Sequence, residues 1–237
     1  MDPEKLLLTL YRTEHLSKQS IKLYQFVGGG ACTCFLIIMM VLVFAPLSVQ
    51  ASEEPEKAEG LGDLLAQYHH FEAEFSQISY DAEGQLVEAT NGRLWLSNPD
   101  RFRIESTEPS NQWLISDGEK LWNYDIDLEQ VIISKLDKSN IPVLLLAKSQ
   151  DEIEKAYETA YFDDEDARVY VLAPKDPDAL FSTLNLTFSG KELRELMVLD
   201  GMGQSTLIVF SKIKVQREMG KDIFVLDIPE GVDVIQE

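Results

Sequence analysis

Cysteine is nearly absent from this chain of 237 residues, which contains only Cys32 and Cys34. Both lie in a segment that has the features of an export signal, so the mature protein is expected to contain none. This excludes a disulfide, a thiolate nucleophile and a cysteine metal site from the mature domain. Neither cysteine ends a convincing lipobox, so we do not expect the mature protein to carry a lipid anchor.

Residues 1–51 have the features of a signal peptide with a polar leader. Lys18 and Lys22 precede the apolar run 31–44, and the small residues that end at Ala51 fit cleavage at that point. An uncleaved membrane anchor is the alternative, because the run with its flanks approaches the roughly 20 residues that span a bilayer. We favour cleavage after Ala51, since the run is short, and therefore expect a periplasmic protein.

Positive charge is scarce, with 21 Lys and Arg against 41 Asp and Glu and a net charge of −20. The first 51 residues hold four basic and three acidic residues, so the mature domain has a net charge of −21. Such a surface repels nucleic acid and anionic lipid headgroups, and we exclude both as partners. Solubility is the first interpretation of this charge, and electrostatic steering toward a basic partner is the alternative.

The residues of catalytic and metal sites are also few. His69 and His70 are neighbours, so their side chains point in different directions and cannot hold one metal; we expect both to be exposed. The acidic run 163–166 lacks the ligand spacing of a calcium loop and is interpreted as a solvated loop. Residues 201–203 are a hairpin turn and not a phosphate loop. We therefore predict no enzyme, no metal and no cofactor.

What the sequence does contain is alternation with a period of two. Residues 52–60 are a flexible lead-in, and residues 61–237 are expected to form one domain that begins with a helix to about residue 69. The alternating runs after this helix predict about ten strands separated by turn residues. They include 71–80, 92–97, 101–105, 129–134, 168–175, 184–190, 193–200, 205–216 and 222–229. Pro142 suits the first turn of one short helix, with Ser139 or Asn140 as its cap.

This pattern predicts a mainly β (α+β) fold, an incomplete antiparallel β-barrel with short helices at its open side and no parallel pairing. Apolar residues that alternate with polar ones are candidates for its concave face. They are Leu94, Leu96, Phe102, Ile104, Trp122, Leu186, Phe188, Leu207 and Phe224. Periodicity alone leaves open whether they form an ordinary core or a ligand surface. The run of leucines at 144–146 must be buried or must cover something.

The order of several motifs resembles the LolA family of periplasmic lipoprotein carriers. The matching stretches are FEAEFSQ (71–77), GRLWLSNPDRFR (92–103), LISDGEKLWNYD (114–125), EQVIIS (129–134), IPVLLLAKSQ (141–150), YVLAPK (170–175) and DIFVLDIPEGVDVI (222–235). The resemblance covers nearly the whole mature chain. It implies a monomer that accepts acylated outer-membrane lipoproteins from the inner-membrane LolCDE transporter and delivers them to the receptor LolB.

The same resemblance implies that acyl chains bind in an apolar concavity under a lid that includes Leu144 and Leu145. In the family an arginine often precedes the proline of the hairpin turn and holds this lid through main-chain carbonyls. Here that position is Asn98, and Arg101 or Arg103 is expected to substitute if Asn98 does not hold the lid. A lipid-sensing or lipoprotein-sensing regulatory module of the envelope stress response is the alternative function.

Overall fold

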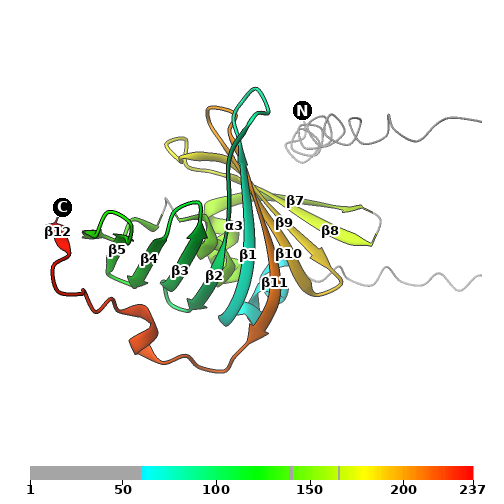
Figure 1. Cartoon of the computed structure of the whole chain (residues 1–237). Coiled ribbons are helices and arrows are strands. Elements are labelled where there is room, and N and C mark those ends of the chain that lie inside the picture. Colours follow the sequence, from blue (N-terminus) through cyan, green and yellow to red (C-terminus); the bar gives the residue numbers. More distant parts are fainter. Residues whose placement is uncertain (1–59, 139–140, 165, 237) are drawn as a thin grey trace, which may run out of the picture. The chain divides into compact units, whose positions relative to one another are not determined.

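The computed structural model describes residues 60–138, 141–164 and 166–236, which form a single twelve-stranded sheet with short helices (Figure 1). The predicted signal peptide and residues 52–59 of the lead-in lie outside the described residues. Within the described ranges, no helix has both the length and the hydropathy needed to cross a membrane.

The elements follow one another in short segments. The helical ones are α2 (Leu61–Leu65), η1 (Ala66–Tyr68), η3 (Pro142–Ala147), α3 (Gln150–Ala156) and η4 (Lys221–Phe224). The strands are β1 (His70–Tyr80), β2 (Leu86–Ser97), β3 (Arg101–Glu108), β4 (Gln112–Asp117), β5 (Lys120–Asp125), β6 (Gln130–Lys135), β7 (Tyr157–Asp164), β8 (Ala167–Pro174), β9 (Phe181–Ser189), β10 (Glu192–Asp200), β11 (Ser205–Val215) and β12 (Asp233–Gln236).

The strand order is β12-β6-β5-β4-β3-β2-β1-β11-β10-β9-β8-β7, so two meanders are joined where β1 pairs with β11. The predicted antiparallel, mainly β architecture is confirmed. The prediction that no strands pair in parallel is wrong at one edge, where β12 runs parallel to β6. The chain reaches that edge by a long crossing from β11, and a crossing connection of this kind allows parallel pairing.

Gly92 lies at the centre of the sheet, where β1 and β2 pair and Phe75 is its register partner. A Cβ at this position would lie 2.2 Å from the carbonyl oxygen of Glu105 and 2.6 Å from Cζ of Phe75. The strand therefore needs glycine here, because the neighbouring strand and the buried Phe75 ring occupy the space of a side chain.

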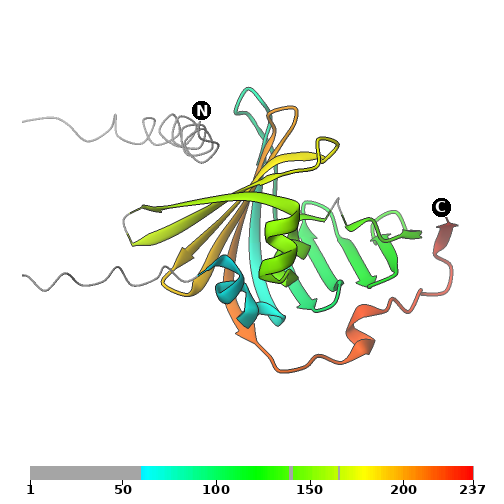
Figure 2. The ribbon, with the colours of Figure 1, turned by 180° about the vertical axis from the view of Figure 1, so that it is seen from behind.

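Four helical elements, α2, η1, η3 and α3, lie on one side of the sheet, and Figure 2 shows α2, η1 and α3 in front of it. We refer to them together as the helical cover, and to the sheet face that they contact as the inner face. The first half of the cover consists of α2 and η1, and the second half consists of η3 and α3. The two halves meet where the main-chain nitrogen of Gly62 donates to Oε1 of Gln150 at 2.7 Å. The first helix and the short helix at Pro142 were both expected, and Pro142 is in its first turn.

The structure differs from the sequence-based prediction in three local elements. Residues 222–229 do not form a strand; they contain η4 and an irregular segment. Strand β7 and helix α3 were not expected, although Ser149 and Glu152 form a capping box that the sequence displays. The candidate caps of η3, residues 139–140, lie outside the described residues, and Ile141 occupies the N-cap position.

Candidate functional site

Six of the predicted apolar residues lie together on the inner face. In β2 and β3 the register pairs Leu94 with Ile104 and Leu96 with Phe102, and Leu186 and Phe188 lie on β9. Ile104 is partly buried and the other five are buried. Alternation therefore placed these residues correctly, because successive side chains of a strand point to opposite faces.

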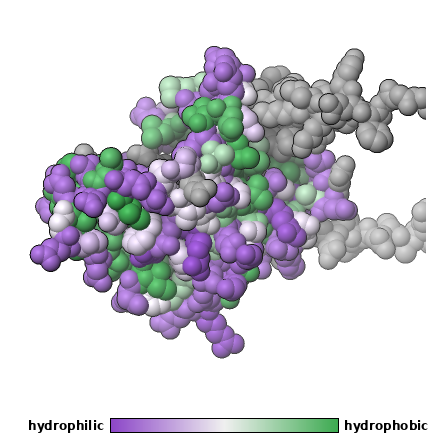
Figure 3. All heavy atoms as spheres, viewed as in Figure 1, coloured by the Kyte–Doolittle hydropathy of each residue, from purple (hydrophilic) through white to green (hydrophobic). Residues whose placement is uncertain are grey.

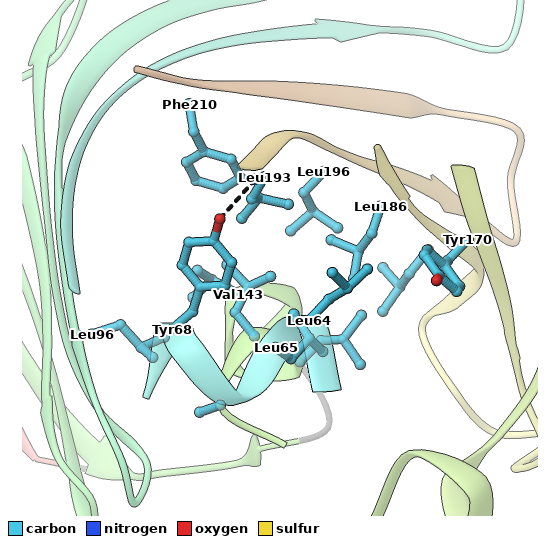
Figure 4. Close-up of a cluster of buried hydrophobic side chains, with 14 of the residues drawn as sticks. Leu64, Leu65, Tyr68, Leu96, Val143, Tyr170, Leu186, Leu193, Leu196 and Phe210 are labelled. Atoms are coloured by element: carbon cyan, nitrogen blue, oxygen red, sulfur yellow. Dashed lines mark hydrogen bonds between the residues drawn. The ribbon is translucent and has the colours of Figure 1, made fainter. Parts of the chain in front are cut away.

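The helical cover fills the space in front of this face with its own apolar side chains. Leu145 and Leu146 of η3 belong to the same buried cluster as Leu94, Leu96 and Leu186, and Leu144 packs beside Phe102 in an adjacent cluster. Figure 4 shows Leu64, Leu65 and Val143 of the cover beside the strand residues Leu186, Leu193 and Leu196. Each leucine removed from water in this way contributes on the order of 1.5–3 kcal/mol to closure.

Tyr68 joins the first half of the cover to the sheet. Its hydroxyl accepts a hydrogen bond from the main-chain nitrogen of Leu193 at 2.8 Å, the dashed line in Figure 4, and donates to the carbonyl of Lys191 at 3.1 Å. Burial raises the pKa of this phenol. The first half of the cover is therefore fixed by both packing and hydrogen bonds.

The second half of the cover is held at its end by Asn98. The side-chain Nδ2 of Asn98 donates to the carbonyl oxygen of Ala147, the last residue of η3, at 3.3 Å. Oδ2 of Asp100, in the same turn, lies 2.5 Å from Nζ of Lys138, which precedes η3 in the chain; a solvent-accessible ion pair of this kind contributes little by itself. The Asn98 contact and the apolar packing connect the cover to the turn between β2 and β3, and the ion pair connects this turn to the segment before η3.

Arg101 and Arg103 do not hold the lid. Arg101 donates to Oγ of Ser97 and to the carbonyl of Asn98, and its guanidinium lies 5.6 Å from the centre of the Phe224 ring. Arg103 donates to the carbonyl of Ile223 at 3.3 Å. Both side chains point away from the inner face, because they alternate with Phe102, so they bind the C-terminal segment instead.

Trp122 and Phe224 were also expected on the inner face, and both lie on the opposite face. Trp122 is the register partner of Ile115, which is in turn opposite Arg103. It packs with Leu226 in a second cluster. The C-terminal segment crosses this outer face and brings η4 against β3 and β4. The face seen in Figure 3 is largely hydrophilic with separate apolar areas.

Leu207 is the third residue that the structure places differently. It is opposite Ile78 and Met197 in the sheet, whereas its neighbours Ile208 and Phe210 belong to the inner cluster. The β11 sequence TLIVF is apolar on both faces, so alternation could not choose between Leu207 and Ile208.

Several inner-face residues were missed by the analysis of the sequence. They are Phe71, Ala73, Phe75, Leu114, Leu121, Tyr170, Leu172, Leu184, Leu193, Leu196 and Phe210. Most alternate within predicted strands, so the parity of each strand could have found them. The sequence did not show which parity faces the cover in strands whose partners were unknown.

The polar groups near the site include two histidines and a few buried hydroxyl and amide side chains. His69 and His70 are partly buried, not exposed as expected. Nδ1 of His70 lies 2.9 Å from Oγ of Ser97, a fully buried hydroxyl. Within the described residues, the buried polar side chains are Thr, Ser and Asn, and no charged residue is buried. A carboxyl group in an apolar setting, which acid–base catalysis commonly uses, is therefore not found in this part of the chain.

The capping box of α3 contains a carboxylate that accepts hydrogen bonds in its ionised form. The main-chain nitrogen and the hydroxyl of Ser149 donate to the carboxylate of Glu152, and these hydrogen bonds hold the pKa of Glu152 below its ordinary value. A depressed pKa stabilises the folded state above the unfolded pKa of about 4.3, and this contribution is lost as pH falls through the folded pKa.

We expect the amide protection of α3 to decrease over that acidic range, and the Glu152→Gln variant to lack this component. Carboxyl chemical shifts followed by NMR during an acid titration measure the pKa directly. An ordinary pKa for Glu152 would contradict the assignment.

The fold and the site together define an open antiparallel half-barrel whose apolar inner face is closed by a helical cover. Residues 66–227 match the family model described as outer membrane lipoprotein carrier protein LolA. The chain is 39% identical over 194 residues to an outer-membrane lipoprotein carrier protein of Chromohalobacter salexigens, covering 81% of this chain and 91% of that relative. It is 37% identical over 206 residues to the carrier protein of Pseudomonas aeruginosa, covering 84% and 99%.

This chain belongs to the LolA family. Among solved structures it is similar to a LolA superfamily protein from Nitrosomonas europaea, with a TM-score of 0.42, 13% identity and coverage of 69% of this chain and 96% of that one.

Proposed function

We propose that this protein is a periplasmic carrier that shields the acyl chains of outer-membrane lipoproteins on its inner face. The observation that supports this most strongly is the helical cover, which packs leucines against apolar strand residues and is tied to the β2–β3 turn at Asn98. Movement of this cover would expose the largest apolar cluster among the described residues. Membership of the carrier family agrees with this assignment.

The energetics explain why such a carrier is needed. A triacylated lipoprotein exposes about 45 methylenes, which at ~0.8 kcal/mol each corresponds to a cost on the order of 35 kcal/mol in water. Closure of the cover over an empty inner face offsets part of the gain from acyl burial, because the closed-state contacts must first be broken. Cargo is then bound strongly enough to cross the periplasm and weakly enough to be released.

In this proposal the protein performs no covalent chemistry. It receives lipoproteins from the inner-membrane LolCDE transporter, which supplies the energy for loading, and passes them to LolB. The protein acts as a monomer after its signal peptide is cleaved.

Loss of the Asn98 side chain is expected to favour the open cover. The Asn98→Ala variant removes one hydrogen bond of about 1 kcal/mol, which corresponds to roughly a fivefold shift in the opening equilibrium. Hydrogen exchange of the η3 amides should accelerate by about that factor. Asn91→Ala is the matched control, since the Asn91 side chain bonds to Ser76 far from η3. Equal exchange in both variants would refute the latch.

Uptake of cargo tests the function itself. The protein is expressed in a periplasm, isolated without detergent and examined by mass spectrometry for bound acylated lipoproteins. It is then mixed with membranes that contain the LolCDE transporter, ATP and a labelled lipoprotein. We expect a soluble one-to-one complex that transfers its lipoprotein to LolB. An empty protein that also accepts no lipoprotein from the transporter would refute the proposal.

A further inference from the structure

A cleft where residues 118–120 and 133–138 come together, at the β5–β6 end of the sheet, gathers positive charge on a protein that is otherwise strongly acidic. Its volume is about 570 Å³. Lys120, Lys135 and Lys138 line it, and among the described lining residues only Glu119 is acidic. The whole chain has about half as many basic as acidic residues. A local excess of positive charge here therefore contrasts with the repulsive field of the rest of the surface.

Two of these lysines are opposite each other. Lys120 and Lys135 are register partners in the β5–β6 ladder, and within the described residues neither forms a salt bridge. Like charges directly opposite each other destabilise a strand pair. An anion between them would relieve this repulsion, so the arrangement fits a ligand better than it fits stability alone.

The cleft also lies along the edge of β6. Among the described residues, the last pair of the β12–β6 ladder is Gln236 with Ile133, and the lining continues along β6 through Ser134, Lys135 and Leu136. An extended peptide can pair with such an edge through its main chain while its side chains contact the flanking residues. Figure 3 shows hydrophilic and apolar residues intermixed at this end of the sheet, at the left of the view.

The neighbouring contacts connect the cleft to the cover. Lys138 is the residue that pairs with Asp100 in the β2–β3 turn. Leu136 packs with Leu144 of η3 and with Phe102. A ligand that competes with Asp100 for Lys138 would therefore separate the β2–β3 turn, which holds η3 through Asn98, from the segment that precedes η3.

From these observations we propose that the cleft lined by Lys120, Lys135 and Lys138 binds an acidic, extended peptide segment of a protein partner. This binding weakens the closed state of the cover. A bilayer is a poorer occupant than a peptide, because a cleft of about 570 Å³ admits one extended segment, whereas a flat anionic membrane would also face the acidic surface around the cleft. Only the identity of the partner, a protein of the lipoprotein relay, rests on the proposed function.

The test uses capped hexaglutamate and hexaglutamine peptides and the ¹⁵N-labelled protein isolated from the periplasm. We expect hexaglutamate to shift the amide signals of residues 118–120 and 133–136, and its affinity to fall at least tenfold between 20 and 200 mM salt, as charge pairing requires. Hexaglutamine should leave these signals unchanged. Equal binding of both peptides would overturn the proposal.

Variants identify the residues. Changing Lys120, Lys135 and Lys138 together to glutamine should weaken hexaglutamate binding at least tenfold. The matched control changes Lys175, Lys212 and Lys214 to glutamine, removes the same charge elsewhere and should alter affinity by less than twofold. An equal loss in both triple variants would reduce the effect to net charge and overturn the site.

Two further measurements test the competition between the peptide and Asp100 for Lys138, and the binding of other anionic ligands. Asp100→Asn, which tolerates the positive φ of 58° at this position, should raise hexaglutamate affinity by about two- to fourfold because Lys138 is freed. Binding of phosphatidylglycerol vesicles or inorganic phosphate in place of the peptide would overturn the assignment. The titration contains no lipoprotein, so its failure would leave the carrier function intact, and failed cargo uptake would leave the cleft intact.

Discussion

Replacing Leu145 with alanine is expected to raise the apparent affinity for an acylated lipoprotein by at least about tenfold. Leu145 is 1% exposed and packs into the inner cluster from η3. Truncation of a buried leucine costs about 2–5 kcal/mol, and 1.4 kcal/mol corresponds to a factor of ten in affinity. In the proposed mechanism this cost falls on the closed, empty state and not on the loaded one, so cargo has less to displace.

The measurement is equilibrium binding of a fluorescent acylated peptide, combined with urea unfolding to record the loss of stability. Leu226→Ala is the matched control, since Leu226 is buried in the outer cluster and does not contact the cover. It should lower stability without raising affinity. If Leu145→Ala bound cargo no better than the control, the cover would be part of a permanent core and the lid mechanism would be wrong.

Replacing Gly92 with valine is expected to lower the free energy of unfolding by about 3 kcal/mol, at the upper end of the usual cost of overpacking. The added side chain would meet the carbonyl oxygen of Glu105 and the ring of Phe75 at distances that require movement of the β2–β3 pair. Because main chain lies on one side, a change of rotamer cannot relieve the clash.

Urea unfolding measures this loss, and Gly201→Val is the control. Gly201 lies in the β10–β11 turn, has no positive φ and has nothing within 4 Å of an added Cβ. It should change stability by less than about 0.5 kcal/mol, as surface substitutions usually do. Similar losses in both variants would show that the restriction at Gly92 is general to valine and not due to the close strand approach.

The strands whose two faces differ in polarity were predicted best. In β2 and β3 the alternation of Leu94, Leu96, Phe102 and Ile104 with mostly polar residues grouped these four on one face before any partner strand was known. The latch position at Asn98 followed from the family motif, and the structure places its amide against a carbonyl of the cover. These are local patterns, and local backbone geometry is enough to interpret them.

The errors arose where the pattern depended on distant residues. Trp122 and Phe224 are apolar and were assigned to the concave face. Trp122 lies on the outer face through its register with Ile115, and Phe224 belongs to η4, which packs against β3 and β4 on that face. In β11, Leu207 and Ile208 are equally apolar, so only the register with β1 and β10 decides which of them faces the cover. Arg101 and Arg103 were assigned to the lid and bind the crossing segment instead.

By itself the sequence determined the mainly β fold class, the turns between the strands, the acidic surface and the family motif. These features follow from periodicity, proline, glycine and charge, which act within a few residues of one another. The tertiary structure alone decided which face of β5 and of β11 is inner and where the C-terminal segment lies. It also decided that Lys120 of β5 shares one cleft with Lys135 and Lys138 at the end of β6. The physical reason is that side chains far apart in the sequence compete for the same space, and only the packed sheet determines which of them meet.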